Sequence, residues 1–136
     1  MVKITASYLG DLHCKLTHEP SGTSIETDAP KDNMGRGESF SPTDLAATSL
    51  LSCILTTMAI YAKRQGKEFP RCEGEVIKEM SVEQPRRIAK LLVTVRMPKG
   101  LPKDERAAYE RAGDNCPVFK SLSSATQILT KYLYSD

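Results

Sequence analysis

The sequence has no tryptophan, and aromatic residues make up only 6% of its 136 residues. It also lacks an excess of either charge, because 19 Lys and Arg are nearly matched by 17 Asp and Glu, for a net charge of +2. Since the basic residues are scattered among carboxylates, we expect no polyanion such as a nucleic acid as partner. No low-complexity run interrupts the chain, which predicts one domain over residues 1–136.

Two further absences concern secretion and membranes. Residues 1–5 lead directly into strand-like alternation rather than into the apolar segment of a secretion signal. The longest uncharged stretch, residues 45–62, approaches membrane-spanning length, but the five hydroxyl side chains spread around it suit a buried protein helix better than lipid. Four cysteines without a secretion signal are typical of a reducing cytoplasm. We therefore expect a soluble cytoplasmic protein without a membrane segment.

Motifs for metals and nucleotides are missing as well. His13 and Cys14 would point to opposite faces of a strand, and no Cys-x-x-Cys or His-x-x-x-His spacing occurs. The short Gly35-Arg36-Gly37 run is no phosphate-binding loop. Neither a metal nor another cofactor is expected, and Cys14, which shares a strand face with Leu12 and Leu16, is interpreted as a core residue.

The hydrophobic periodicity predicts an α+β fold without an internal repeat. Apolar residues at Leu91, Val93, Val95 and Met97 share one strand face, which indicates the side of that strand that meets the core. The expected order is β-β-β-α-β-β-α-α-β, with strands at 2–8, 12–16, 23–27, 73–80, 87–97 and 126–134 and helices at 42–64, 102–113 and from 117.

The long helix has clear boundary signals. Ser41 is a suitable N-cap, Pro42 suits the first helical position, and Asp44 lies in the first turn. Basic residues and Gly66 end the helix near Arg64. Its residues are apolar or small on every side, which predicts a central helix that is covered all round.

Two cysteines occupy contrasting positions. Cys53 lies in the middle of the long helix, and Cys116 directly precedes Pro117 at the N-cap of a short helix. Two such thiols are what a thiol redox enzyme needs, because one reacts and the other resolves the product as a disulfide. Cys53 is too far from its helix N-terminus for the dipole to activate it, so a cation such as Arg36 would have to reach it, whereas Cys116 has local help for a thiolate. The alternative is that Cys53 is merely a small core residue.

These residues resemble the OsmC/Ohr family of thiol-dependent hydroperoxidases. The resemblance rests on residues 41–53, which read SPTDLAATSLLSC, and on Cys116-Pro117-Val118, and it extends to the turn at residues 84–88 and to residues 106–112. It implies the OsmC-like fold, with antiparallel sheets around a long central helix. It also implies an intertwined homodimer whose active sites lie at the subunit interface.

The resemblance assigns roles to three residues. Cys53 would attack an organic hydroperoxide and become a sulfenic acid, Cys116 would capture that acid as a disulfide, and Arg36 would correspond to the family's arginine, although its offset from the proline differs. An external dithiol, lipoyl-type in the well-studied branch, would restore both thiols. One departure weakens the inference to efficient turnover: Thr43 stands where the peroxidase branches have the Glu that orients the arginine. Asp44 follows it but points about 100° away around the helix, and Glu38 in the loop is the alternative.

Two functional hypotheses follow from the sequence. The first is a thiol-dependent peroxidase that uses Cys53, Cys116 and Arg36. The second is a non-enzymatic dimer of the same fold that binds a small hydrophobic ligand at its interface, with Cys53 serving only for packing. The reactivity of Cys53 distinguishes the two.

Overall fold

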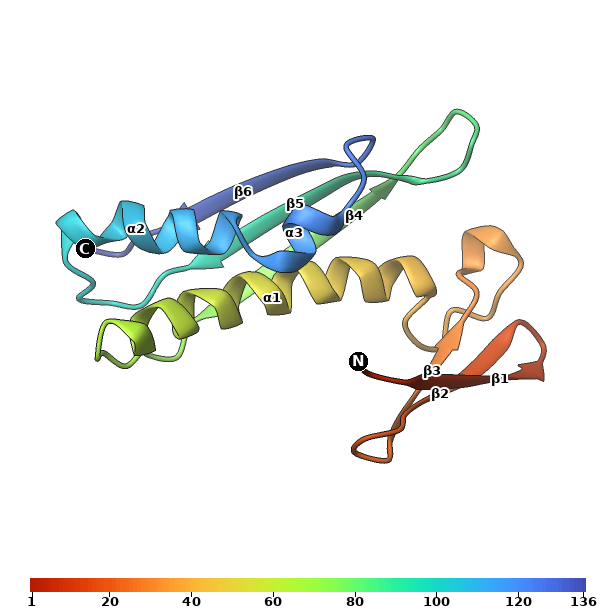
Figure 1. The fold of residues 1–136 in the computed structure, drawn as a ribbon. Helices are drawn as coiled ribbons and strands as arrows, with labels where there is room; N and C mark the ends of the chain where they lie inside the picture. The colour runs from red at the N-terminus through yellow and green to blue at the C-terminus, as the bar shows by residue number, and fades with distance from the viewer. The chain divides into compact units, whose positions relative to one another are not determined.

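The computed structural model describes residues 1–136 and contains the expected elements in the expected order, with one short 3-10 helix added in the loop that precedes the long helix (Figure 1). The chain divides into two compact units, residues 1–46 and 47–136, and each is described by itself. The prediction that the whole chain is one domain therefore stays a prediction.

The N-terminal unit is a three-stranded antiparallel sheet in the order β1-β2-β3. Its apolar side chains are largely exposed, among them Tyr8 and Ile25, and its buried residues Thr27, Asp28 and Ser41 are all polar. This sheet is therefore held by backbone pairing and polar contacts more than by a hydrophobic core. Its elements are β1 (Ile4–Gly10), β2 (His13–His18), β3 (Thr23–Asp28) and the 3-10 helix η1 (Lys31–Asn33).

The C-terminal unit contains a second three-stranded sheet, in the order β4-β5-β6. Strands β4 (Glu73–Met80) and β5 (Ile88–Arg96) are antiparallel, as expected. Strand β6 (Gln127–Leu133), however, runs parallel to β5, so this sheet is mixed rather than wholly antiparallel. The reason is the long connection through α2 (Lys103–Asp114) and α3 (Pro117–Ser121), which carries the chain back before β6 begins.

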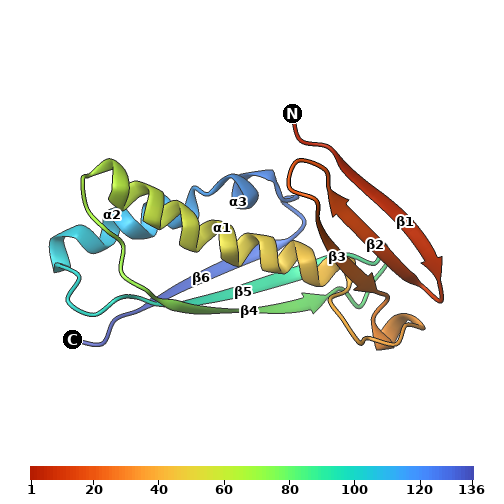
Figure 2. The same cartoon turned by 90° about the horizontal axis from the view of Figure 1, so that it is seen from below.

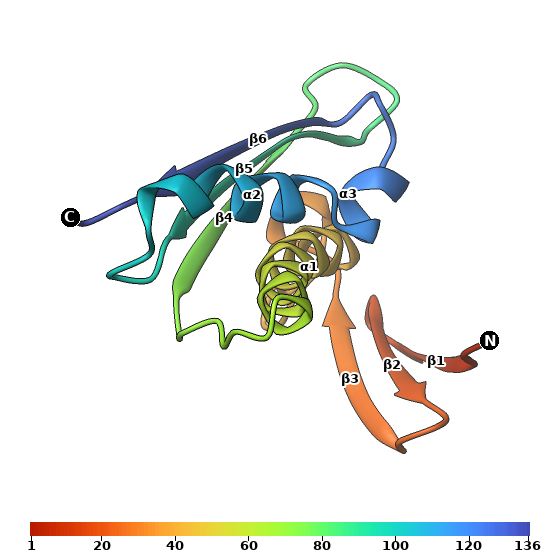
Figure 3. The ribbon, with the colours of Figure 1, turned by 60° about the vertical axis from the view of Figure 1, so that its left-hand side comes forward.

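The helices of this unit lie on one face of the second sheet, with α1 (Pro42–Arg64) and α2 side by side beneath it (Figures 2 and 3). The predicted core face of β5 is confirmed, since Leu91, Val93 and Val95 are at most 1% exposed. The hydrophobic core joins that face to one stripe of α1 and to α2. It consists of Ala47, Leu50, Ile54, Met58, Ala62, Leu91, Val93, Val95, Met97, Tyr109 and Cys116.

Helix α1 begins and ends where its sequence signals predicted. The Asp44 N–H donates to Ser41 Oγ (3.1 Å), and the Ser41 N–H donates to Asp44 Oδ2 (2.9 Å), so the two residues cap each other. At the other end Gly66 has a positive φ of 72°, and the Lys67 N–H donates to the Ala62 carbonyl, as in a glycine-terminated helix.

The prediction that α1 is covered on all sides does not hold within one chain. Its buried residues recur every three or four positions and form one stripe, whereas Ser49, Ser52, Thr56 and Ile60 on the other side are exposed. By length and composition alone α1 could cross a membrane. Its buried stripe is nevertheless part of the hydrophobic core just described, as in the core helix of a globular protein.

Candidate active site

Cys53 lies halfway along α1 and is half-buried. Its Sγ lies 3.8 Å from Oγ1 of Thr57, one helical turn later, which is a weak sulfur–hydroxyl hydrogen bond. Cys53 is not among the fully buried residues of the helix, although it packs against the core that they form. Cys53 therefore lies at the boundary between the buried stripe of α1 and its exposed side.

Cys116 is the N-cap of α3, as predicted, and Pro117 occupies the first helical position. The Phe119 N–H donates to Cys116 Sγ (3.3 Å). The side chain is fully buried and lies close enough to the Cys53 side chain for Cys53 to raise its pKa. The structure thus brings together two thiols that are 63 positions apart in the sequence, and both are free.

Burial determines the ionisation of Cys116. Desolvation raises the pKa of its thiol to about 11, the Phe119 N–H opposes this, and the neighbouring Cys53 adds to the rise. The expectation that the helix start favours a Cys116 thiolate is therefore wrong in its net result. The predicted hydrogen bond exists, but the loss of solvent outweighs it, and Cys116 is a neutral thiol near pH 7.

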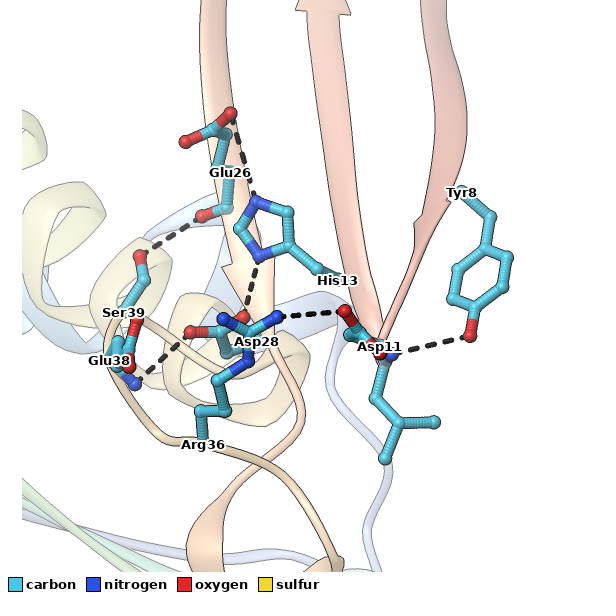
Figure 4. Close-up of polar contacts among 9 residues, drawn as sticks. Tyr8, Asp11, His13, Glu26, Asp28, Arg36, Glu38 and Ser39 are labelled. Carbon is cyan, nitrogen blue, oxygen red and sulfur yellow. Dashed lines mark hydrogen bonds and ion pairs between the residues drawn. The ribbon is translucent and has the colours of Figure 1, made fainter.

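Arg36 lies in the loop before α1 and forms an ion pair with Asp11 (Nη2–Oδ2 3.1 Å) (Figure 4). Together with Leu12 and Met34, these two residues line an open hollow of about 490 Å³. Asp11, Leu12 and Met34 all have positive φ angles (52°, 60° and 66°), a region that residues other than glycine rarely adopt. Such backbone is retained where the surroundings impose it, often near functional groups.

A polar network behind this loop was not predicted from the sequence. His13 Nδ1 lies 2.6 Å from Asp28 Oδ1 and its Nε2 lies 3.7 Å from Glu26, while Asp28 Oδ2 accepts the Glu38 N–H (3.1 Å) (Figure 4). The hydrogen bond to Asp28 raises the pKa of His13, and the same bond lowers the pKa of Asp28. The signal that could have revealed this pair is the strand register, because His13 and Asp28 are direct partners across β2 and β3.

Of the two carboxylates near the position of the family's Glu, that of Asp44 is engaged in the cap of α1. The Asp44 carboxylate accepts the Ser41 N–H, and Thr43 Oγ1 lies 3.2 Å from Ser41 Oγ. The backbone of Glu38 is fixed to Asp28. Position 43 therefore contributes to the polar start of α1, without the carboxylate that the peroxidase branches have there.

The other two cysteines stand apart from the pair. Cys14 is half-buried on β2, opposite Tyr8 and Thr27, and is not part of the hydrophobic core in which we expected it. Cys72 is half-buried at the edge of that core, and desolvation raises its pKa. Neither Cys14 nor Cys72 is hydrogen-bonded to Cys53 or to Cys116.

Comparison with known proteins places this geometry in a family. The sequence profile of the OsmC-like proteins matches residues 35–131, a range that contains Arg36, Cys53 and Cys116. The chain belongs to the OsmC-like family. A proposed osmotic stress induced and detoxification response protein of Psychrobacter arcticus 273-4 shares 34% identity with it over 98% of this chain and 96% of that one, with a TM-score of 0.90. No curated protein matches the chain significantly.

More distant OsmC-like structures share the fold. An organic hydroperoxide resistance protein OsmC of Legionella pneumophila is 16% identical over 97% of this chain and 96% of that one, with a TM-score of 0.73. The organic hydroperoxide resistance protein OhrB of Bacillus subtilis is 18% identical over 98% of each chain, with a TM-score of 0.63. The predicted OsmC-like fold is thus confirmed over almost the full length.

Proposed function

We propose that this protein reduces organic hydroperoxides with the thiol pair Cys53 and Cys116. The observation that carries the proposal is the position of Cys116, which is fully buried and close enough to Cys53 for that thiol to raise its pKa. Two free thiols that are close together in the fold can form a disulfide if their Cα atoms lie, or can move to lie, about 4.4–6.8 Å apart. Membership of a family that includes hydroperoxide resistance proteins supports the same chemistry.

The reaction divides into three steps. The Cys53 thiolate attacks one oxygen of the hydroperoxide, the O–O bond breaks, and the departing alkoxide takes a proton to become an alcohol, which leaves Cys53 as a sulfenic acid. The Cys116 sulfur then attacks the Cys53 sulfur, forming the S–S bond and releasing water. An external dithiol, of lipoyl type in the family's well-studied branch, reduces this disulfide and is itself oxidised to a disulfide.

The properties of Cys116 suit the second step better than the first. With a pKa raised to about 11, Cys116 is protonated near pH 7 and does not compete with Cys53 for peroxide. The proton that it loses during disulfide closure can leave with the hydroxyl of the sulfenic acid as water. Burial thus separates the roles of two chemically identical side chains.

In this proposal Arg36 stabilises the Cys53 thiolate, which has no cation or helix N-terminus in its own segment. Asp11 pairs with Arg36 and the His13–Asp28 network supports the loop that carries it. Because Thr43 replaces the orienting Glu, Arg36 is held by other partners than in the peroxidase branches, and we expect slower turnover than theirs.

We further propose that the protein acts as a cytoplasmic homodimer without nucleic acid or membrane partners. The exposed side of α1 and the exposed apolar residues of the first sheet support a dimer, because a second copy could cover both. In the alternative function the dimer binds a small hydrophobic ligand at the interface and Cys53 remains unreactive.

Single-turnover oxidation tests the proposal. The reduced protein is mixed with a stoichiometric amount of cumene hydroperoxide, and the products are followed by thiol counting and peptide mass mapping. We expect loss of two of the four thiols of each chain and a disulfide between Cys53 and Cys116. A Cys14→Ser, Cys72→Ser double variant should react equally, and Cys116→Ser should stop at a sulfenic acid that dimedone traps. A Cys53 that reacts no faster than free cysteine would reject the peroxidase and favour ligand binding.

A further inference from the structure

The short helix that carries Cys116 cannot hold this residue in place by itself. Helix α3 has only five residues, and a helix of that length is unstable without outside contacts. Disulfide closure is nevertheless sensitive to position, because a misplacement of about 1 Å can slow a reaction about 100-fold. The contacts that fix the segment before Cys116 therefore bear on its chemistry.

Asp114 ties that segment to strand β6. The Tyr132 hydroxyl donates to Asp114 Oδ1 (2.7 Å), with the Glu110 carbonyl as a longer contact (3.4 Å), and the Thr130 hydroxyl donates to the same Oδ1 (2.9 Å). Thr130 and Tyr132 alternate along β6 and lie on its more buried face. Two neutral donors thus converge on one carboxylate oxygen at the end of α2.

Gly113 fixes the same segment against helix α1. It is buried, and a Cβ added there would lie 2.6 Å from Tyr132 Oη, 3.1 Å from Ile54 Cγ2 and 3.5 Å from Met58 Cγ. Only a residue without a side chain lets the backbone approach so closely. Ile54 directly follows Cys53 in the chain. The contact between Gly113 and Ile54 therefore places the segment before Cys116 next to the turn of α1 that contains Cys53.

The connection from this clamp to Cys116 is direct. The Cys116 N–H donates to the Gly113 carbonyl (3.1 Å). The backbone of Cys116 is therefore bonded to Gly113, the residue that is packed between β6 and α1. We propose that Asp114, Thr130, Tyr132 and Gly113 form a positioning clamp that holds Cys116 opposite Cys53 and sets the rate of disulfide closure. This inference rests on the proposed function, in which the two thiols form a disulfide.

Tyr134, the first residue after β6, provides a matched control. Its Oη donates to Glu110 Oε1 (2.6 Å), so this tyrosine also ties the chain to α2, but not to the segment before Cys116. The Arg106 guanidinium stacks on its ring at 4.2 Å. Tyr132→Phe and Tyr134→Phe therefore each remove one phenolic hydrogen bond to helix α2, and only the first loosens the clamp.

Thiol–disulfide exchange with glutathione tests the clamp without any peroxide. In a Cys14→Ser, Cys72→Ser background, oxidised glutathione converts the two remaining thiols to a disulfide and becomes reduced glutathione, and the equilibrium gives their effective concentration. For Tyr132→Phe we expect a fall of about tenfold or more in this effective concentration and in the rate of ring closure. Gly113→Ala should also lower the effective concentration, whereas Tyr134→Phe should have the same effective concentration as the parent protein. In urea unfolding, both tyrosine variants should lose similar stability. Asp114→Asn, which keeps an acceptor oxygen, should lie between Asp114→Ala and the parent.

Equal effective concentrations in Tyr132→Phe, Tyr134→Phe and the parent would overturn the clamp. An equal fall in both tyrosine variants would overturn it too, since the effect would then be one of general stability. Failure of the peroxidase proposal gives a different result. The thiols would still close in glutathione buffer in a Tyr132-dependent manner, while cumene hydroperoxide would leave Cys53 reduced.

Discussion

The two units of the chain stabilise their sheets in different ways. The second sheet is covered by α1 and α2 and contributes fully buried residues such as Leu91 and Val95 to the core. The first sheet buries only polar residues and leaves Tyr8 and Ile25 about half exposed or more. A three-stranded sheet without a covered apolar face is marginal in water. The C-terminal unit can therefore be stable through its own core, whereas the N-terminal unit depends on further contacts.

The chemistry is divided along the same lines. Both thiols of the proposed reaction belong to the C-terminal unit, where burial and packing fix Cys116. The proposed activating cation, Arg36, belongs to the N-terminal unit, where ion pairs and hydrogen bonds hold the loop. In the proposed reaction, formation of the disulfide would thus depend on a packed core, and activation of Cys53 on an exposed polar network.

The largest contrast should appear in stability. Leu91→Ala removes a fully buried side chain of β5 and should lower the free energy of unfolding by about 2–5 kcal/mol. Ile25→Ala changes a residue of β3 that is 48% exposed and should cost about 1 kcal/mol or less. Urea unfolding followed by circular dichroism measures both. A loss for Ile25→Ala as large as that for Leu91→Ala would mean that Ile25 is buried in solution, as it would be if a second copy covered the first sheet.

The next effect concerns the proposed link between the units. Arg36→Ala should slow alkylation of Cys53 near pH 7 by about tenfold or more, because the thiolate loses its stabilising cation. Alkylation of Cys116 should change little, since burial governs its pKa. Iodoacetamide labelling with mass mapping gives both rates.

Thr43→Glu provides the complementary variant for that link. It restores the orienting carboxylate and should speed peroxide reduction if Arg36 acts as proposed. Unchanged labelling of Cys53 in Arg36→Ala would show that the N-terminal unit does not supply the activator.

The proposed dimer should be visible as a molecular mass in solution of twice the mass of one chain. If a second copy covers the first sheet and the open side of α1, the protein should have twice the 15.0 kDa chain mass at micromolar concentration. Light scattering after size-exclusion chromatography measures this. A stable monomer would contradict the dimer and would leave the N-terminal unit as exposed in solution as it is in the single chain.

The smallest effect should be the titration of the His13–Asp28 pair. The raised pKa of His13 means that its bond stabilises the fold fully below about pH 6.5 and that this contribution is lost as the pH rises through the folded-state value. The lowered pKa of Asp28 means that its share is lost as the pH falls through that value. The His13–Asp28 pair therefore stabilises the fold most at pH values between the lowered pKa of Asp28 and the raised pKa of His13. Asp28→Asn should move the His13 midpoint, followed by NMR, down toward 6.5, and an unmoved midpoint would show that another group raises it.

Local signals in the sequence were sufficient for much of the fold and for part of the site. The caps Ser41 and Gly66 fixed the ends of α1, alternation fixed the core face of β5, and Cys116-Pro117 fixed an N-cap, because each depends only on neighbouring residues. The run from Ser41 to Cys53, together with Cys116-Pro117-Val118, was enough to indicate the family.

Other features depend on residues that are distant in the sequence, and only the tertiary structure decided them. The parallel pairing of β6 follows from the crossover through α2 and α3, and the pairing of His13 with Asp28 follows from the strand register. The exposed side of α1 could not be read from a helix that is apolar or small all round. The ionisation of Cys116 is the clearest case, because the sequence showed the helix start that favours a thiolate but not the burial that outweighs it.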